Sequence, residues 1–537
     1  MTKIKRRDLL RQAGSLLITS AGVSACCGPR AGAEIIPRKA TLSTAAQARA
    51  TAVAFQHGVA SGDPGTDRVI LWTRVQPLVS TSPNAVTVNY WVSTDPAGRQ
   101  RVAEGQTPAK SAHDYTIHLD IQGLDPDRHY YYGFEASGAS SPTGRTRTLP
   151  EQSDHVRLAM GSCSNYAHGY FNAYARIAER DDLHAMVHLG DYIYEGDPQR
   201  RRSYDVLVRT PEPPRSVRTL ADYRLRHAHY RSDPDLQLAH QRHPWICIWD
   251  DHEIANNASR NGAPAHLPRH GSYASRLAAA VQAYYEWMPI RRPSADDPLR
   301  IYRKFRFGKL CELVMLDGRI IGRDPQLPRN ASPTELADPK RSMLGERQER
   351  WLADTLTESK RAGVRWRLLG QQTMLGQLQV QGRPPNLDQW DGYPAARKRL
   401  FDTLQRSQID NLVVLTGDIH SSWAIELAPD PFNPTTYDPA TGRGALAVEI
   451  VCPGLTSGSP YRSKRVQHLP AYYRQTHPHV RYLEAKRQGY VVLDVQPERM
   501  RCEWYLLPTV TQHSTEQVLD QALDIPSGTA RLQPAPH

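Results

Sequence analysis

A short apolar run that leads directly into a polar segment decides the fold class of this 537-residue chain: Ala185-Met186-Val187-His188-Leu189 is followed by Gly190-Asp191-Tyr192-Ile193-Tyr194-Glu195. Apolar runs of about four to eight residues that end in turn residues are typical of strands buried on both faces of a sheet. Helical patterns lie between such runs, at residues 276–288 and 346–359. This alternation predicts a layered α/β core. The runs that we interpret as its strands are residues 156–160, 185–189, 245–249, 313–316, 366–370, 412–416 and 447–451.

The chain before this core has a different pattern. Short alternating runs separated by Pro, Gly, Asp and Ser clusters favour a small all-β sandwich of the fibronectin or immunoglobulin type. We therefore predict a β-sandwich domain over residues 54–150 that ends in a linker at 138–150, a core domain over 151–510 and a weakly structured tail over 511–537. A long basic surface loop is predicted at 197–218. The alternating runs are residues 68–74, 85–92, 114–119 and 130–134.

The first 33 residues have the features of a twin-arginine export signal. Arg6 and Arg7 precede a mildly apolar stretch at residues 13–25, and a basic amphipathic helix of the mature protein is the alternative. Two cleavage sites are compatible with a signal: a lipoprotein-like sequence would make Cys26 an acylated membrane anchor, whereas Ala31-Gly32-Ala33 would release the chain. Both imply that the twin-arginine machinery exports the chain to the periplasm or cell envelope. No later stretch has the roughly 18 apolar residues that a membrane span needs.

The composition is that of a folded globular protein. Hydrophobic residues make up 39% and charged residues 23% of the chain, which argues against a disordered or multi-spanning membrane protein. The 67 Lys and Arg residues exceed the 55 Asp and Glu residues by 12, so long-range attraction favours anionic partners. The basic residues are dispersed and form no module with interleaved aromatic residues, so we expect no stable nucleic-acid partner.

Polar clusters directly follow five of the predicted strands. In α/β sheets the loops at the carboxyl ends of the strands converge on one crevice, so clusters that are distant in sequence can share one site. Together they offer carboxylate, imidazole, phenolate, thiolate and amide groups, which suit a centre of several metal ions and not a nucleophilic triad. The clusters are Cys163-Ser164-Asn165, Gly190-Asp191-Tyr192-Ile193-Tyr194-Glu195, Asp250-Asp251-His252-Glu253, Asp317-Gly318-Arg319 and Gly417-Asp418-Ile419-His420.

Such a centre fits the hydrolysis of phosphate esters. The reaction needs a deprotonated water and neutralisation of the negative charge on the phosphoryl oxygens, and adjacent metal ions supply both. Asp191 could bridge two ions through its two oxygens, and Tyr194 offers the anionic phenolate that a hard trivalent ion favours. We expect Asp250 to orient its neighbours. Taken alone, Cys163 is better explained as a structural thiol in a loop.

The motifs, in this order, resemble those of the alkaline phosphatase D (PhoD-like) family of metallophosphoesterases. The resemblance extends from Phe55 to about Pro508, which is nearly all of the chain. The segments that carry it are Gly58-Val59-Ala60-Ser61-Gly62-Asp63-Pro64, Leu71-Trp72-Thr73-Arg74, Gly161-Ser162-Cys163-Ser164-Asn165-Tyr166, His188-Leu189-Gly190-Asp191-Tyr192-Ile193-Tyr194-Glu195, Trp249-Asp250-Asp251-His252-Glu253 with Asn256-Asn257, Asp388-Gln389-Trp390-Asp391-Gly392-Tyr393-Pro394 and Leu415-Thr416-Gly417-Asp418-Ile419-His420.

The resemblance implies an exported phosphomonoesterase and phosphodiesterase with an N-terminal β-sandwich and a metallophosphatase-type α/β core. It implies cleavage by metal-activated water at a ferric ion (Fe3+) with calcium ions (Ca2+). Cys163, Asp191 and Tyr194 match the iron-binding motifs of the family. Residues 317–321 depart from the commoner family form, because they lack the threonine and polar residues often found there. By similarity, further metal ligands would be Asp251, Asp418 and His420, the acid at the leaving group would be His252, and a phosphate contact would be Arg319.

Two other classes of function remain open from the sequence. One is a dedicated phosphodiesterase or phospholipase D on the same scaffold, acting on lipid or on a teichoic-acid-like polymer. The other is a non-enzymatic envelope protein in which the sandwich binds a ligand. The intact ligand set argues against this second class, and a phosphatase assay would separate it from an enzyme.

Overall fold

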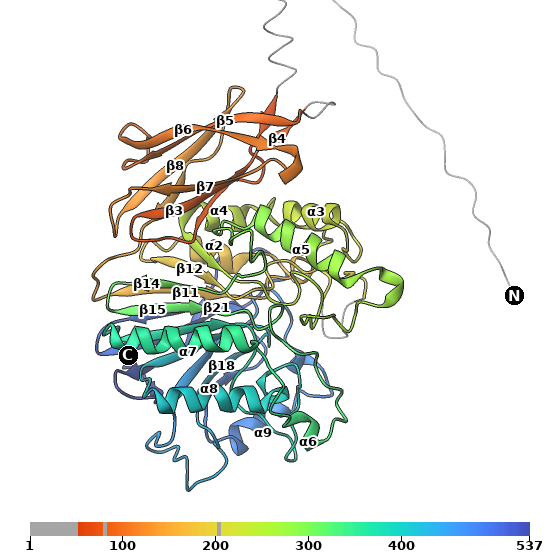
Figure 1. Cartoon of the computed structure of the whole chain (residues 1–537), viewed down its shortest axis with the longest axis vertical. Helices are drawn as coiled ribbons and strands as arrows, with labels where there is room; N and C mark the ends of the chain where they lie inside the picture. The colour runs from red at the N-terminus through yellow and green to blue at the C-terminus, as the bar shows by residue number, and fades with distance from the viewer. Residues whose placement is uncertain (1–51, 79–82, 201–205, 537) are drawn as a thin grey trace, which may run out of the picture. The chain divides into compact units, whose positions relative to one another are not determined.

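The computed structural model describes residues 52–78, 83–200 and 206–536 (Figure 1). All of them belong to one compact unit, Ala48–His537. The twin-arginine segment and both cleavage sites that were predicted for it lie outside the described residues.

A ten-stranded sheet carries the first part of the core. Strands β11, β12, β13 and β2 are parallel neighbours at its centre, with Leu158 opposite Ala185 and Met186 opposite Trp245. Antiparallel strands extend it on both sides. The order is β24 (Gln533–Pro534), β23 (Val518–Pro526), β22 (Arg499–Leu506), β21 (Gly489–Val495), β11 (Val156–Gly161), β12 (Ala185–His188), β13 (Pro244–Cys247), β2 (Val59–Gly62), β3 (Arg68–Arg74) and β7 (Thr116–Gln122).

A seven-stranded sheet carries the rest of the core. Its four central strands, β15, β16, β17 and β19, are parallel to one another. All seven predicted core strands therefore exist, three of them in the ten-stranded sheet and four here. The order is β14 (Arg303–Phe307), β15 (Cys311–Met315), β16 (Trp366–Gln371), β17 (Leu412–Thr416), β19 (Ala447–Val451), β18 (Ser422–Leu427) and β20 (Val480–Glu484).

The two sheets share one apolar core, with helices outside them (Figure 1). Leu158 and Ile246 of the ten-stranded sheet lie in the same buried cluster as Leu313 and Leu368 of the seven-stranded sheet. Helices α7 and α8 cover the other face of the seven-stranded sheet. The helices are α2 (Asn172–Ala178), α3 (Leu220–Tyr230), α4 (Pro234–Arg242), α5 (Tyr273–Trp287), α6 (Pro333–Leu336), α7 (Glu346–Arg361), α8 (Pro394–Arg406) and α9 (Leu469–Thr476).

The predicted β-sandwich strands are present, but they divide between two sheets. A five-stranded sheet packs through an apolar cluster against β3 and β7, which are the last strands of the ten-stranded sheet. The second layer of the sandwich is thus continuous with the core. The boundaries at 54–150 and 151–510 stay a prediction. The strands of the five-stranded sheet are β5 (Ala85–Ser93), β6 (Arg101–Lys110), β8 (His129–Ala136), β9 (Ala139–Ser140) and β10 (Gly144–Arg147), and β1 (Val53–Ala54) pairs with β4 (Gln76–Pro77).

Two sequence predictions about connecting segments are wrong. The linker predicted at 138–150 contains β9 and β10, because Gly144 and Thr146 face inward and alternate with arginines that face outward. The tail predicted to be weakly structured contains β23, which pairs with β22 along its whole length. In β23 the buried residues Leu523 and Ile525 alternate with Asp524, which accepts hydrogen bonds from Arg501. Polar inward or ion-paired positions hide the period of two in both segments.

The described parts of the basic loop, Asp197–Arg200 and Val206–Arg218, contain no helix or strand, as predicted. Among the described residues, no helix is both long enough and apolar enough to cross a membrane.

Candidate metal centre

The carboxyl ends of strands from both sheets meet at one site. Cys163 follows β11, Asp191 follows β12 and Asp251 follows β13, all from the ten-stranded sheet. Arg319 follows β15 and Asp418 follows β17, both from the seven-stranded sheet. The predicted convergence at strand ends is therefore observed, but two sheets build the crevice where a single sheet was expected.

Four of the candidate ligands lie on left-handed backbone. The φ angles are 61° at Cys163, 57° at Asp191, 61° at Asp418 and 57° at His420. Residues other than glycine adopt this conformation rarely and at a cost of about 1–3 kcal/mol each, and such residues cluster at functional sites. The loops turn sharply at these positions, and the four side chains belong to the groups of possible metal ligands at the site.

Glu253 ties the loops after β12 and β13 together. Its buried carboxylate accepts hydrogen bonds from the backbone N–H of Asp191 at 2.9 Å, of Asp250 at 2.7 Å and of Tyr192. Burial raises the pKa of Glu253 to about 7, although these N–H donors act to lower it. Gly190 lies so close to Asp250 that a Cβ atom there would clash with the Asp250 backbone. The two loops are thus fixed against each other before any ion binds.

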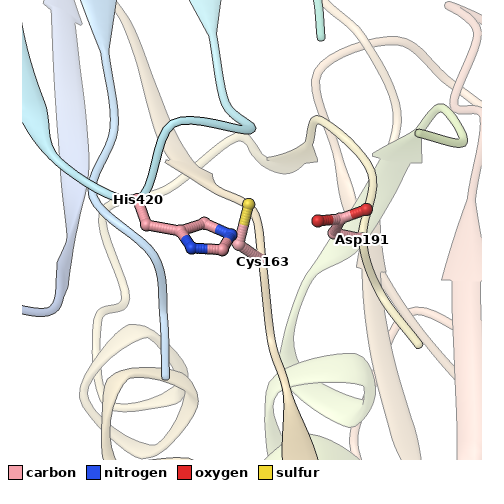
Figure 2. Close-up of side chains that lie close together, drawn as sticks. All are labelled: Cys163, Asp191 and His420. Carbon is pink, nitrogen blue, oxygen red and sulfur yellow. The ribbon is translucent and has the colours of Figure 1, made fainter. Parts of the chain in front are cut away.

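Cys163, Asp191 and His420 form the first group able to hold a metal ion, with one donor atom from each within 4.8 Å of the others (Figure 2). Tyr194 joins them. Its hydroxyl donates to Asp191 Oδ2 at 2.8 Å, lies 3.1 Å from His420 Nε2 and accepts from Ser457 Oγ at 2.7 Å. The group combines the thiol, phenol, carboxylate and imidazole that the sequence predicted.

Burial raises the pKa of the Cys163 thiol and of the Tyr194 phenol well above their ordinary values, and the neighbouring Asp191 adds to both shifts. Both groups are therefore protonated near neutral pH unless a cation stabilises their anions. A bound cation would release these protons, which couples occupancy of the site to pH.

Two further groups surround Asp251. Asp191, Asp251 and His252 form one, and Asp250, Asp251 and Asp418 form the other, again with donor atoms within 4.8 Å of each other. Asp250 Oδ2 and Asp251 Oδ1 are buried and have no hydrogen-bond partner among the described residues. Buried carboxylate oxygens without a partner are costly, and a cation between them would satisfy both. These residues therefore fit a metal ion, and Asp250 joins them as a possible ligand where the sequence predicted only an orienting role.

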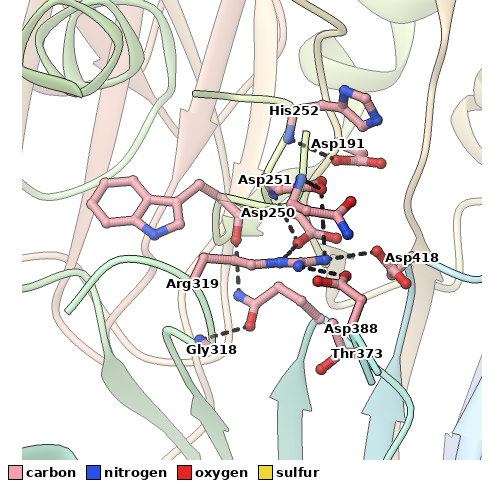
Figure 3. A network of polar contacts seen from close by, with 12 residues as sticks. Asp191, Asp250, Asp251, His252, Gly318, Arg319, Thr373, Asp388 and Asp418 are labelled. Carbon is pink, nitrogen blue, oxygen red and sulfur yellow. Dashed lines mark hydrogen bonds and ion pairs between the residues drawn. The ribbon is translucent and has the colours of Figure 1, made fainter. Parts of the chain in front are cut away.

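Arg319 is fully buried among four aspartates (Figure 3). Its Nε donates to Asp250, its Nη1 to Asp388 at 2.8 Å and its Nη2 to Asp418 at 2.7 Å, and Nη2 lies 3.9 Å from Asp251. All three guanidinium nitrogens are thus engaged with carboxylates. The predicted contact between Arg319 and a phosphate oxygen stays a prediction.

His252 stands beside these groups. Its Nδ1 lies 2.6 Å from Glu195 Oε2, and its ring stacks on Tyr194 with centroids 4.1 Å apart. Burial acts to lower the pKa of His252, but Asp191, Glu195 and Asp251 outweigh burial and raise the pKa well above its ordinary value. Its Nε2 makes no hydrogen bond to any of the described residues, so this nitrogen is available to a ligand.

The site opens into a cavity of about 520 Å³. Asp191, Asp251, His252, Asp418 and His420 line its floor. One wall is apolar and aromatic and includes Leu378, Val466, Leu469, Tyr461 and Tyr473.

Several residues that contact the site were part of the sequence motifs, but the sequence analysis assigned them no role. Asp388 and Gln389 reach the site from a segment without a strand and bind Arg319 and Asp418. Glu195 and Glu253 act on His252 and on the loop backbone. The presence of an acidic residue in each motif could have indicated a contribution to the site. Its interaction partner is visible only in the three-dimensional structure.

Comparison with known proteins places the chain in a family. The model of the PhoD-like phosphatase family matches residues 158–504, and that of its N-terminal domain matches residues 40–150. The chain is 37% identical over 474 residues to alkaline phosphatase D of Bacillus subtilis (strain 168), which covers 85% of this chain and 78% of that protein. A solved structure of PhoD superimposes with a TM-score of 0.81 at 33% identity, covering 90% of this chain and 92% of the other. The chain therefore belongs to the PhoD-like phosphatase family of phosphate-ester hydrolases.

Proposed function

We propose that this phosphatase is a metal-dependent hydrolase of phosphate monoesters and diesters with a metallophosphatase-type core. The observation that carries the proposal is the set of three overlapping ligand groups around Asp191 and Asp251 on the floor of the cavity. Membership of a phosphatase family argues against a non-enzymatic binding protein.

We assign Cys163, Asp191 and Tyr194 to a ferric ion, and Asp251 and Asp418 to further ions, with calcium as the second metal. His420, which the resemblance assigned to the further ions, lies beside Cys163, Asp191 and Tyr194, so we place it with the ferric group. The raised pKa values of the Cys163 thiol and the Tyr194 phenol support the first assignment. A trivalent cation stabilises the anions of these two groups most strongly and so offsets the cost of removing their protons. Oxygen-rich carboxylates suit calcium. When bound, such ions would neutralise charge on the phosphoryl oxygens and make water more acidic.

The protein's own residues have separate tasks in this proposal. Glu195 holds Nδ1 of His252, so the imidazolium keeps its proton even when cations neutralise Asp191 and Asp251. Nε2 can then donate a proton to the departing alkoxide. Arg319 fixes Asp250, Asp388 and Asp418 in position and leaves their remaining oxygens for ligands.

A preference for diesters is the second candidate, favoured by the cavity of about 520 Å³, whose apolar and aromatic wall beside the ligand groups could take a second ester arm. Rates on matched p-nitrophenyl monoester and diester substrates would separate the two. A diester-only enzyme would release no phosphate from the monoester.

The ferric assignment predicts colour. Phenolate and thiolate bound to a ferric ion give a charge-transfer band in the visible range, so the isolated protein should be coloured. Tyr194→Phe and Cys163→Ser should each shift or bleach the band and lower iron content and activity together, by at least about tenfold, because each removes an anionic donor. Absorbance, elemental analysis and p-nitrophenyl phosphate hydrolysis on the same preparation would measure all three.

Tyr192→Phe is the matched control. It removes another buried phenol two residues away, whose hydroxyl bonds to His240 at 3.0 Å, so it should keep the band and the iron. A colourless, iron-free wild-type protein that is fully active with calcium alone would reject the ferric assignment and leave the phosphoesterase proposal intact.

We also propose export by the twin-arginine machinery, supported by Arg6 and Arg7 ahead of the apolar stretch. Changing both to Lys should leave active enzyme in the cytoplasm, because the export receptor reads the arginine pair. Cell fractionation with activity assays would test this, and unchanged export would show that the pair is incidental. Cys26→Ala would then release the enzyme from membranes if Cys26 carries a lipid anchor.

A further inference from the structure

A second cavity of about 300 Å³ lies on the other side of His252. It shares His252, Asn256 and His420 with the main cavity, so the two spaces meet at the candidate metal centre. The rest of its wall comes from α3, α5, the segments that precede these two helices, the loop after β11 and Gly458. A substrate held at the metal centre can therefore extend into both cavities.

Two buried arginines form the inner wall of this second cavity. Arg226 is 1% exposed, and its guanidinium donates only to backbone carbonyl groups, among them Pro213 O at 2.6 Å and Arg215 O at 3.0 Å. Arg276 is 5% exposed and donates to Tyr223 Oη at 2.9 Å and Val217 O at 3.1 Å. Neither forms an ion pair with a described carboxylate. Two positive charges thus line the cavity with neutral partners only.

More positive charge lies at the rim. Arg218 is exposed, and its Nη2 lies 3.2 Å from His270 Nε2. Partial desolvation and repulsion from Arg218 and Arg269 lower the pKa of His270.

The main cavity is lined by more carboxylates than the second cavity. The main cavity is lined by Asp191, Asp251, Asp388, Asp391 and Asp418. The second cavity is lined by two carboxylates, Glu195 and Asp197. Both oxygens of Glu195 are occupied, by His252 Nδ1 and by the backbone N–H of Asn256 at 2.8 Å. Asp197 accepts from the backbone N–H of Gln199 at 2.9 Å and lies 3.8 Å from Arg200 Nε. Apart from any bound ions, an anionic group on a substrate would therefore meet more positive charge in the second cavity than in the main one.

We propose that the second cavity binds an anionic group, a phosphate or a carboxylate, on the alcohol arm of the ester. The preferred substrates are then phosphate esters that carry a second anion, with the leaving arm beside His252. This rests on the proposed phosphoesterase function and adds the class of substrate. Arg218, Arg226 and Arg276 supply the charges, and charge-assisted hydrogen bonds to them would be stronger than neutral ones.

The test compares three phosphate esters by release of inorganic phosphate: propyl phosphate, propane-1,3-diyl bisphosphate and 4-phosphonooxybutanoate. The wild-type enzyme should show a kcat/KM at least about tenfold higher for a substrate with a second anion than for propyl phosphate, since one charge-assisted contact is worth about a factor of ten or more. Comparison of the bisphosphate with 4-phosphonooxybutanoate shows whether the second cavity prefers a phosphate or a carboxylate.

Arg218→Glu should lower this preference at least about tenfold, because it places a negative charge at the rim of the cavity. Arg269→Glu is the matched control: Arg269 is exposed and adjacent to His270 but does not line the cavity, so the preference should remain. Equal kcat/KM values for all three substrates, or equal losses in both variants, would overturn the proposal. No phosphate release from any of them would instead reject the phosphoesterase function on which it rests.

Discussion

Asp191→Asn is expected to lower kcat/KM for p-nitrophenyl phosphate by at least about 100-fold. Asp191 is common to two of the three ligand groups, and its two oxygens face Tyr194 and the backbone of His252. The amide removes the negative charge from both groups at once. Changing residues that merely orient metal ligands costs about 10- to 100-fold, so loss of a shared ligand should cost more.

The control for this variant is Asp354→Asn, which changes an exposed aspartate on α7 that lines neither cavity. It should retain wild-type activity. Circular dichroism and thermal unfolding would establish that Asp191→Asn still folds, which we expect because the side chain keeps its size. More than about a tenth of wild-type activity at saturating metal would contradict the prediction that Asp191 bridges two ions.

Arg319→Met is expected to cause the largest loss of stability in metal-free protein, about 3–5 kcal/mol, because it removes the cation that contacts Asp250, Asp388 and Asp418 together, whereas Arg323 pairs with Asp388 alone. Asp250, Asp388 and Asp418 would then repel one another in a dry environment. Calcium should restore much of the lost stability, since an ion can replace the guanidinium charge. Thermal unfolding with EDTA and with added calcium would measure both effects.

Arg367→Met is a suitable comparison for Arg319→Met. Arg367 is also buried, but its one ion pair is with Asp410, whose side chain is 57% exposed. Its loss should be smaller and calcium should not reverse it. If Arg319→Met unfolds at the wild-type temperature in EDTA, the carboxylates do not need the guanidinium and the role that we give it is wrong.

The sequence predicted the candidate ligands because each follows an uninterrupted apolar run. The strands before Asp191 and Asp418 are buried on both faces, so their ends were easy to find. The division of these strands between two sheets could not be predicted, because a buried parallel strand has the same composition in either sheet. Asp388 could not be placed because no strand precedes it in the irregular segment between β16 and α8.

The interactions of Glu253 illustrate another limit of the sequence. A glutamate in a polar loop is usually solvated, yet this one is buried and binds the backbone of the loops after β12 and β13. β23 was missed for a related reason, because Asp524, which alternates with the buried Leu523 and Ile525, is paired with Arg501 on the neighbouring strand. Both depend on partners distant in sequence.

The left-handed backbone at Cys163, Asp191, Asp418 and His420 has a consequence for how this enzyme can evolve. Glycine would relieve the backbone strain at each of these positions, so selection for folding alone favours glycine in place of the present residues. Only a functional requirement for the four side chains opposes their replacement by glycine. Variants selected in the laboratory for heat resistance, with no demand for turnover, should therefore accumulate glycine at these four positions, and the candidate ligands would be among the first residues lost.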